Sequence, residues 1–161
     1  MPSANTVDAL VIRDAVVTAI NGQAFAPIAT ATPVYDAIFK LEKLQSFNGG
    51  QLIVMPQSRI ADPGSRGGPR RWTIKIGVAI QYKVSKTPAP ATEVDPYIAE
   101  ACTIADYFER LTPNTFPAVG AGGIVIPANC VKVEHPHLFL EEHLNVFGVL
   151  TSLITLTFLV N

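Results

Sequence analysis

The sequence has few cysteines and little charge of either sign. Cys102 and Cys130 are its only cysteines, each inside an apolar run, so the disulfide framework of a small secreted protein and a CxxC metal or redox motif are both absent. Charged residues make up 16%, with 12 Lys+Arg against 13 Asp+Glu and a net charge of -1. Because sequence-independent affinity for nucleic acid rests on neutralising phosphates, this balance argues against a polyanion-binding protein.

Long apolar runs and targeting signals are also missing. The most apolar stretch, Val146 to Val160, has 15 residues and carries four hydroxyl side chains, whereas a membrane-spanning helix needs roughly 20 residues. The first residues show no basic region followed by an apolar one, so we expect no secretory signal and folding in a reducing cytoplasm. With 48% hydrophobic residues and little net charge, the 161 residues predict one folded domain, 1–161, rather than a disordered chain.

Two segments have helical periodicity. Apolar residues recur at helical spacing from Val7 to Ile20, with Asn5 and Thr6 as caps and Asn21-Gly22 as a stop. A second helix is predicted from Pro96 to Leu111, because Asp95-Pro96 is a good helix start. Its apolar face contains Ala101, Ala105 and Phe108, and Glu100 is expected on the solvated face.

Several segments predict β-strands. Phe25 to Thr32 suits a short edge strand, and Gln51 to Met55 reads as a buried strand. Trp72 to Val84 alternates between apolar and polar residues, which predicts a long half-buried strand. Val146 to Val160 is apolar on both faces and is therefore expected at the centre of a sheet. Short strands are expected at 124–126 and 130–134.

The connections complete the predicted layout. Pro56 to Arg71 reads as a long loop that holds four arginines, and His135 to Asn145 reads as a polar connection. Asp36 to Leu44 is either a helical turn or a loop. The order of elements predicts an α+β domain, with two helices packed on a mainly antiparallel or mixed sheet of about four strands.

Motifs for catalysis are scarce. The best enzyme-like cluster combines Glu134, His135, His137 and His143, which zinc would accept, but their spacing matches no recognised metal motif. There is no GxSxG and no cysteine beside a histidine, and the glycine- and arginine-rich run 64–71 lacks the lysine and the following helix of a phosphate-binding loop. We therefore predict no catalytic residue, no metal and no cofactor, and keep a small metal-dependent enzyme as an alternative.

The sequence resembles the tail terminator, or tail completion, proteins of long-tailed bacteriophages. The resemblance lies in the hydrophobic pattern and in the order of the segments along the sequence, and it covers most of the chain. Its clearest part is the ending, where an acidic turn that contains leucines, 138–145, is followed by Val146-Phe147 and a Thr-rich terminal strand, 151–158. The other matching segments are the first helix, 33–36, 52–56, the arginine loop, 72–84 and 95–110.

The resemblance implies a non-enzymatic structural virion protein with an α/β fold. Such a protein forms a ring, usually a hexamer, at the head-proximal end of the tail tube, where it ends tube polymerisation and joins the tail to the neck or head. The implied partners are further copies of the chain, the tail tube protein and the neck or head-closure protein. No membrane and no sequence-specific nucleic acid is implied, although viral DNA passes through such a ring. Another neck or head-tail adaptor protein is the alternative within this class.

A ring requires heterologous contacts, in which one patch meets a different patch on the neighbour. The chain is poor in charge, yet cations gather in one loop and carboxylates in another. We therefore expect Arg66, Arg70 and Arg71 to contact acidic groups on a neighbouring subunit or tail protein, with Glu141 and Glu142 as candidate partners.

Overall fold

The chain folds into an α+β domain built on one mixed sheet. The computed structural model describes residues 7–36, 38–61, 71–111, 118–119, 123, 125–126 and 128–160. The helices are α1 (Asp8–Gln23), α2 (Leu41–Ser46), α3 (Ala91–Arg110) and α4 (Glu141–Phe147). The strands are β1 (Ala31–Thr32), β2 (Gly50–Ala61), β3 (Trp72–Lys83), β4 (Ala118–Val119), β5 (Val125–Ile126), β6 (Ala128–His137) and β7 (Val149–Val160).

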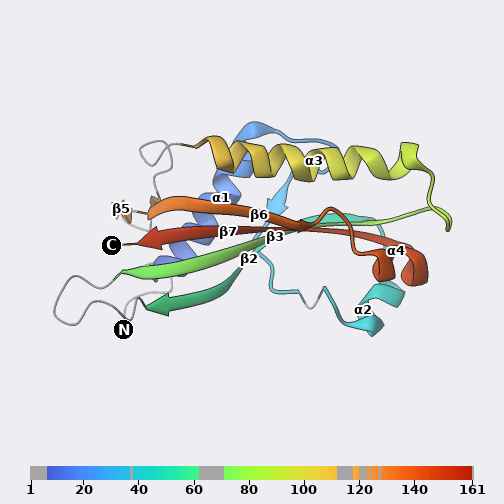
Figure 1. Cartoon of the computed structure of the whole chain (residues 1–161), viewed down its shortest axis with the longest axis horizontal. Helices are drawn as coiled ribbons and strands as arrows, with labels where there is room; N and C mark the ends of the chain where they lie inside the picture. Colours follow the sequence, from blue (N-terminus) through green and yellow to red (C-terminus); the bar gives the residue numbers. More distant parts are fainter. Residues whose placement is uncertain are drawn as a thin grey trace.

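Five strands form the main sheet in the order β1-β2-β3-β7-β6. The pairing of β1 with β2 is parallel, and the other three pairings are antiparallel. β4 and β5 form a separate two-stranded pair. The predicted class is thus confirmed, with two short helices and one sheet strand beyond the expected number. β7 lies between β3 and β6, which confirms the central position predicted for the last strand (Figure 1).

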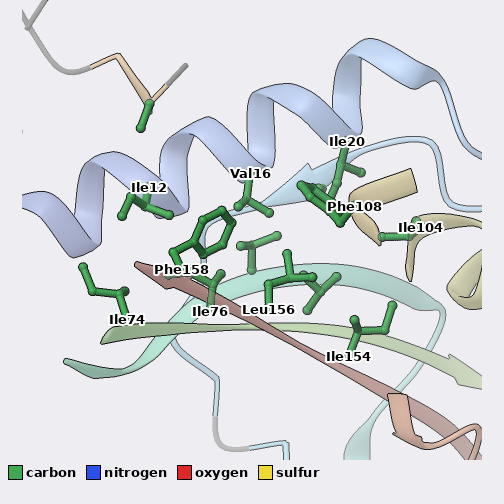
Figure 2. Close-up of a cluster of buried hydrophobic side chains, with 14 of the residues drawn as sticks. Ile12, Val16, Ile20, Ile74, Ile76, Ile104, Phe108, Ile154, Leu156 and Phe158 are labelled. Atoms are coloured by element: carbon green, nitrogen blue, oxygen red, sulfur yellow. The ribbon is translucent and has the colours of Figure 1, made fainter. Parts of the chain in front are cut away.

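The main core lies between one face of the sheet and the two long helices, α1 and α3. Figure 2 shows Ile12, Val16 and Ile20 of α1 pointing toward the sheet. Buried residues of β3 and β7 meet them, and Ile104 and Phe108 of α3 close the cluster. The strand residues of this cluster share one face because side chains alternate along a strand. We call this the helix face of the sheet.

The described segments that cover the opposite face of the sheet lie near one end. There α2, α4 and the turn before α2 lie beneath the sheet (Figure 1). Ile38 packs on Ile53 and Ala79, and this contact buries the side of β3 that the alternation had assigned to solvent. β3 is therefore more buried than the half-buried strand predicted from its pattern. We call this side the second face.

Both long helices differ from their predicted bounds. α1 continues through Asn21-Gly22 to Gln23, because Ala24 is the residue that adopts the left-handed conformation and ends the helix. α3 begins at Ala91, before the predicted Asp95-Pro96 start. Its added first turn buries Val94 beside Val84 and Leu150, and that packing outweighs the loss of the hydrogen bond at Pro96.

Other predicted bounds were also wrong. β2 continues through Pro56 to Ala61, because a bulge between Pro56 and Ser58 and the open edge beyond two-residue β1 both accommodate proline. The predicted polar connection 135–145 contains instead the end of β6 and most of α4. α4 runs to Phe147, so the last strand begins at Val149 rather than Val146. Of the region predicted as a helical turn or loop, 36–44, only the end joins α2.

Glu100 is also placed differently from the prediction. It lies on the inner side of α3 and is 2% exposed, although its charge suggested the solvated face. No helix among the described residues is long and apolar enough to cross a membrane.

Candidate interaction surfaces

The predicted arginine surface is described only at its last residue. Arg66 and Arg70 lie outside the described residues. Arg71 is exposed and directly precedes β3, whose first residue, Trp72, pairs with Val160. Arg71 is therefore available to a partner at the end of the sheet where the chain ends.

Arg59, which the sequence assigned to the same loop, lies within β2 and is engaged inside the chain. Its Nε and Nη2 donate to the two carboxylate oxygens of Asp8, at 2.8 and 3.0 Å. Its guanidinium also stacks on the Trp72 ring, with Cζ 3.4 Å from the ring centroid. Because a bidentate pair and a cation–π contact act together, Arg59 fastens the start of α1 to the sheet.

The predicted acidic residues are exposed at the start of α4. Glu141 and Glu142 occupy the first turn of this helix, where carboxylates interact favourably with the helix dipole. The helix ends at Gly148, whose left-handed conformation lets its N–H bond the carbonyls of His143 and Leu144. The two carboxylates thus stand on a short, well-terminated helix.

Arg71 and the acidic pair are not brought together within one chain. Arg71 lies beside the Trp72–Val160 pair, whereas α4 directly precedes Val149, which pairs with Lys83 at the other end of the same strands. A strand of this length spans about 37 Å. Contacts between these charges therefore require a second molecule.

The histidine cluster does not form a metal site in the described part of the chain, which includes all three histidines. His135 Nε2 bonds the Ser152 hydroxyl at 2.8 Å, and His143 Nδ1 bonds the Thr151 hydroxyl at 2.8 Å. His137 is exposed. Burial lowers the pKa of both His135 and His143, so the neutral imidazole is favoured in each.

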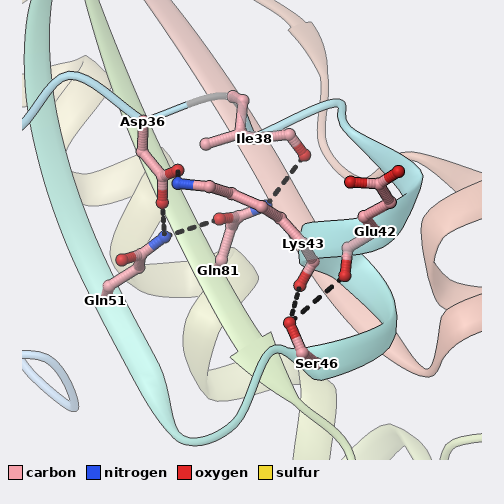
Figure 3. A network of polar contacts seen from close by, with 7 residues as sticks. All are labelled: Asp36, Ile38, Glu42, Lys43, Ser46, Gln51 and Gln81. Atoms are coloured by element: carbon pink, nitrogen blue, oxygen red, sulfur yellow. Dashed lines mark hydrogen bonds and ion pairs between the residues drawn. The ribbon is translucent and has the colours of Figure 1, made fainter.

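A buried polar network, which the sequence analysis missed, holds the covering segment on the second face (Figure 3). Gln51 Nε2 donates to Gln81 Oε1 at 2.7 Å and to Asp36. Gln81 Nε2 donates to the Ile38 carbonyl and, at 3.1 Å, to Thr151 Oγ1, which also bonds His143. The network joins β2, β3 and β7 to α4 and the turn before α2. The only sequence signal was a glutamine on the polar side of a strongly alternating strand.

An apolar hollow lies beside this network on the second face. It has a volume of about 380 Å³, and its lining includes Gly77 and Ala79 of β3, with the Gln57 side chain packed over Gly77. Its apolar wall contains Ile38, Phe39, Met55 and Leu153. Phe39 is 59% exposed and leans edge-on against the His143 ring. Gly77 and Ala79 on the polar side of β3 were the sequence signal for this hollow, which only strand register could resolve.

A second hollow, of about 500 Å³, opens on the helix face between the loop before β1 and α3. Tyr82 and Tyr97 stack in its wall with centroids 4.1 Å apart. Burial, together with the hydrogen bond to Tyr82, raises the pKa of Tyr97 to about 12. One turn further along α3, Glu100 Oε2 accepts the Ile28 N–H at 3.1 Å, and burial raises the pKa of this carboxyl.

Comparison with family models and with curated proteins adds no relative. No protein-family model matches the chain, and no curated protein matches it. The functional argument therefore rests on the residues and on their arrangement.

Proposed function

We propose that this chain is a structural virion protein that forms a ring at the head-proximal end of a bacteriophage tail tube. The ring, a hexamer in this proposal, ends tube polymerisation and joins the tail to the neck or head. Its partners are other copies of the chain, the tail tube protein and the neck or head-closure protein. It has no catalytic role and needs no cofactor.

One observation carries the proposal most directly. The cationic Arg71 and the acidic Glu141 and Glu142 are exposed at opposite ends of one continuous sheet. Such a pair of unlike ends favours head-to-tail contacts, and head-to-tail contacts that close produce a ring. The resemblance of segments such as 138–147 to tail terminators supports a ring at the end of a tail tube.

Native mass spectrometry of the purified protein, alone and with isolated tail tubes, tests the proposal. Six copies of the 17.3-kDa chain give a ring of about 104 kDa. Electron microscopy of the tubes should show new density at one end only. Binding to the portal side instead of tube ends would favour the alternative, another neck or head-tail adaptor. A monomer that ignores tubes at every concentration would contradict the proposal.

Charge reversal tests the predicted contact residues. Arg70→Glu combined with Arg71→Glu should weaken ring formation and tail joining, because repulsion then replaces attraction at the subunit contact. Lys86→Glu is the matched control, since Lys86 is an exposed cation in the loop at the other end of β3. Rings that form equally well with both variants would exclude this role for the arginines.

A further inference from the structure

Away from α2 and α4, a row of polar side chains crosses the second face of the sheet. Register places Ser58 of β2, Lys75 of β3, Thr157 of β7 and Lys132 of β6 side by side across four strands. The α2 and α4 segment covers the other end of this face (Figure 1). Lys132 is exposed and Lys75 is half-buried, so the ammonium groups are the part of this row that a partner can reach.

Two hydroxyls in this row lack a hydrogen-bond partner among the described residues. They are Ser58 Oγ and Thr157 Oγ1, and Thr157 is only 7% exposed. A buried hydroxyl without a partner costs free energy unless a ligand or water satisfies it. Lys132 is ion-paired with Glu134 at 2.8 Å, and Lys75 contributes to lowering the pKa of the same carboxyl. Two cations against one carboxylate leave the row with a net positive charge.

The apolar hollow directly adjoins this row. Gly77, which lines the hollow beneath the Gln57 side chain, lies two residues from Lys75 on the same side of β3. Two residues along a strand correspond to about 7 Å. A partner for this surface therefore needs an apolar side chain followed, about 7 Å away, by an acidic group.

The chain itself carries such a segment. Leu138 and Phe139 are exposed, and Glu141 and Glu142 follow them, also exposed. Phe139 and Glu141 are two residues apart, which matches the spacing of the hollow and Lys75. Within one molecule this segment starts beside the hollow, since His137 pairs with Leu153, but the Leu140 N–H donates to the Thr151 carbonyl at 3.0 Å and holds the segment away from the Lys75 row. Thr151 and Thr157 are separated by about 20 Å along β7.

We infer that the second face of one copy receives the 138–142 segment of a neighbouring copy. Phe139 of the neighbour enters the hollow, and its Glu141 or Glu142 pairs with Lys75 and accepts a hydrogen bond from the Thr157 hydroxyl. The contact is heterologous, because the donor segment and the acceptor face are different patches of the chain. This inference rests on the proposed ring and gives it a specific interface, in which Lys75 is a partner for the acidic pair that the sequence did not identify.

Matched variants test each half of the contact by sedimentation and native mass spectrometry. Phe139→Ser should weaken self-association by about tenfold or more, whereas Val146→Ser, at an exposed apolar position of α4, should leave it unchanged. Lys75→Glu should weaken it similarly, and Lys86→Glu should not. Lys75→Glu combined with Glu141→Lys should recover part of the lost association, because Glu142 still carries the negative charge that the arginines require.

Lysine at the start of α4 opposes the helix dipole, so a second measurement leaves α4 intact. Two chains that lack the native cysteines through Cys102→Ser and Cys130→Ser are mixed, one carrying Met55→Cys and the other Phe139→Cys. Mild oxidation should link them into a heterodimer, and neither chain alone should give this product. A wild-type ring without this link, and unaffected by Lys75→Glu and Phe139→Ser, would overturn the inference and leave the proposed function standing. A wild type that never associates would overturn both.

Discussion

Glu100 is a buried carboxyl whose protonation couples the fold to pH. Burial raises its pKa, and the Ile28 N–H that it accepts offsets only part of this effect. The folded chain therefore holds the proton more tightly than the unfolded chain. Linkage then requires that this group's contribution to the free energy of unfolding falls as pH rises above the ordinary glutamate value of 4.5 and through the raised pKa.

Glu100→Gln should remove this loss, because glutamine is neutral and its side-chain oxygen still accepts the Ile28 N–H. We expect the stability of the variant relative to wild type to increase with pH from about 4.5 upward. Urea unfolding at a series of pH values measures the difference. Parallel curves for the two proteins would show that Glu100 ionises in the fold without penalty.

At the scale of elements, Gln81 connects the sheet to the segment that covers its second face. Gln81→Leu keeps the side-chain volume but removes the hydrogen bonds to Gln51, Thr151 and the Ile38 carbonyl. We expect the free energy of unfolding to decrease by about 1–3 kcal/mol, because buried polar groups of the sheet and of the covering segment lose their hydrogen-bond partner. Hydrogen exchange should accelerate in α2 and α4 and stay slow in α1 and α3. Equal protection of all four helices would contradict this role.

His143 gives the same element a pH dependence of opposite sign. Its pKa is lowered below 6.5 by burial, despite the opposing effect of Glu142, so its contribution to stability is present above pH 6.5 and lost as pH falls below that value. His135 behaves alike, through its own burial. As pH decreases, each histidine can steepen the fall in the free energy of unfolding by at most about 1.4 kcal/mol per pH unit. His143→Gln should flatten the plot of the free energy of unfolding against pH between pH 6.5 and 5, as measured by urea unfolding. An unchanged slope would contradict this role of His143.

The elements also show what periodicity can and cannot predict. β7 was predicted as central because both of its faces are apolar, and β3 was found because its alternation is regular over twelve residues. The start of α3 was missed, because Asp95-Pro96 is a strong local signal and the packing of Val94 on Val84 and Leu150 is not local. The extension of β2 through Pro56 depends on an open sheet edge, which only the strand order reveals.

At the scale of the whole molecule, sequence reasoning found charged groups but not the surface between them. It selected five contact residues, and the three of them that the structure describes are exposed: Arg71, Glu141 and Glu142. Arg66 and Arg70 lie outside the described residues. It did not find the hollow or the row of Lys75 and Thr157, because these depend on which residues of four strands lie side by side. Cross-strand register is set by tertiary structure and leaves little trace in one sequence.

The central claim is that the chain assembles head-to-tail into a closed ring at a tail tube end. The most direct test is native mass spectrometry of the wild-type protein mixed with isolated tail tubes, with the tube ends viewed by electron microscopy. The account predicts a ring of about 104 kDa, six copies of the 17.3-kDa chain, and a cap at one end of each tube. A protein that stays monomeric and leaves both tube ends unchanged would contradict it.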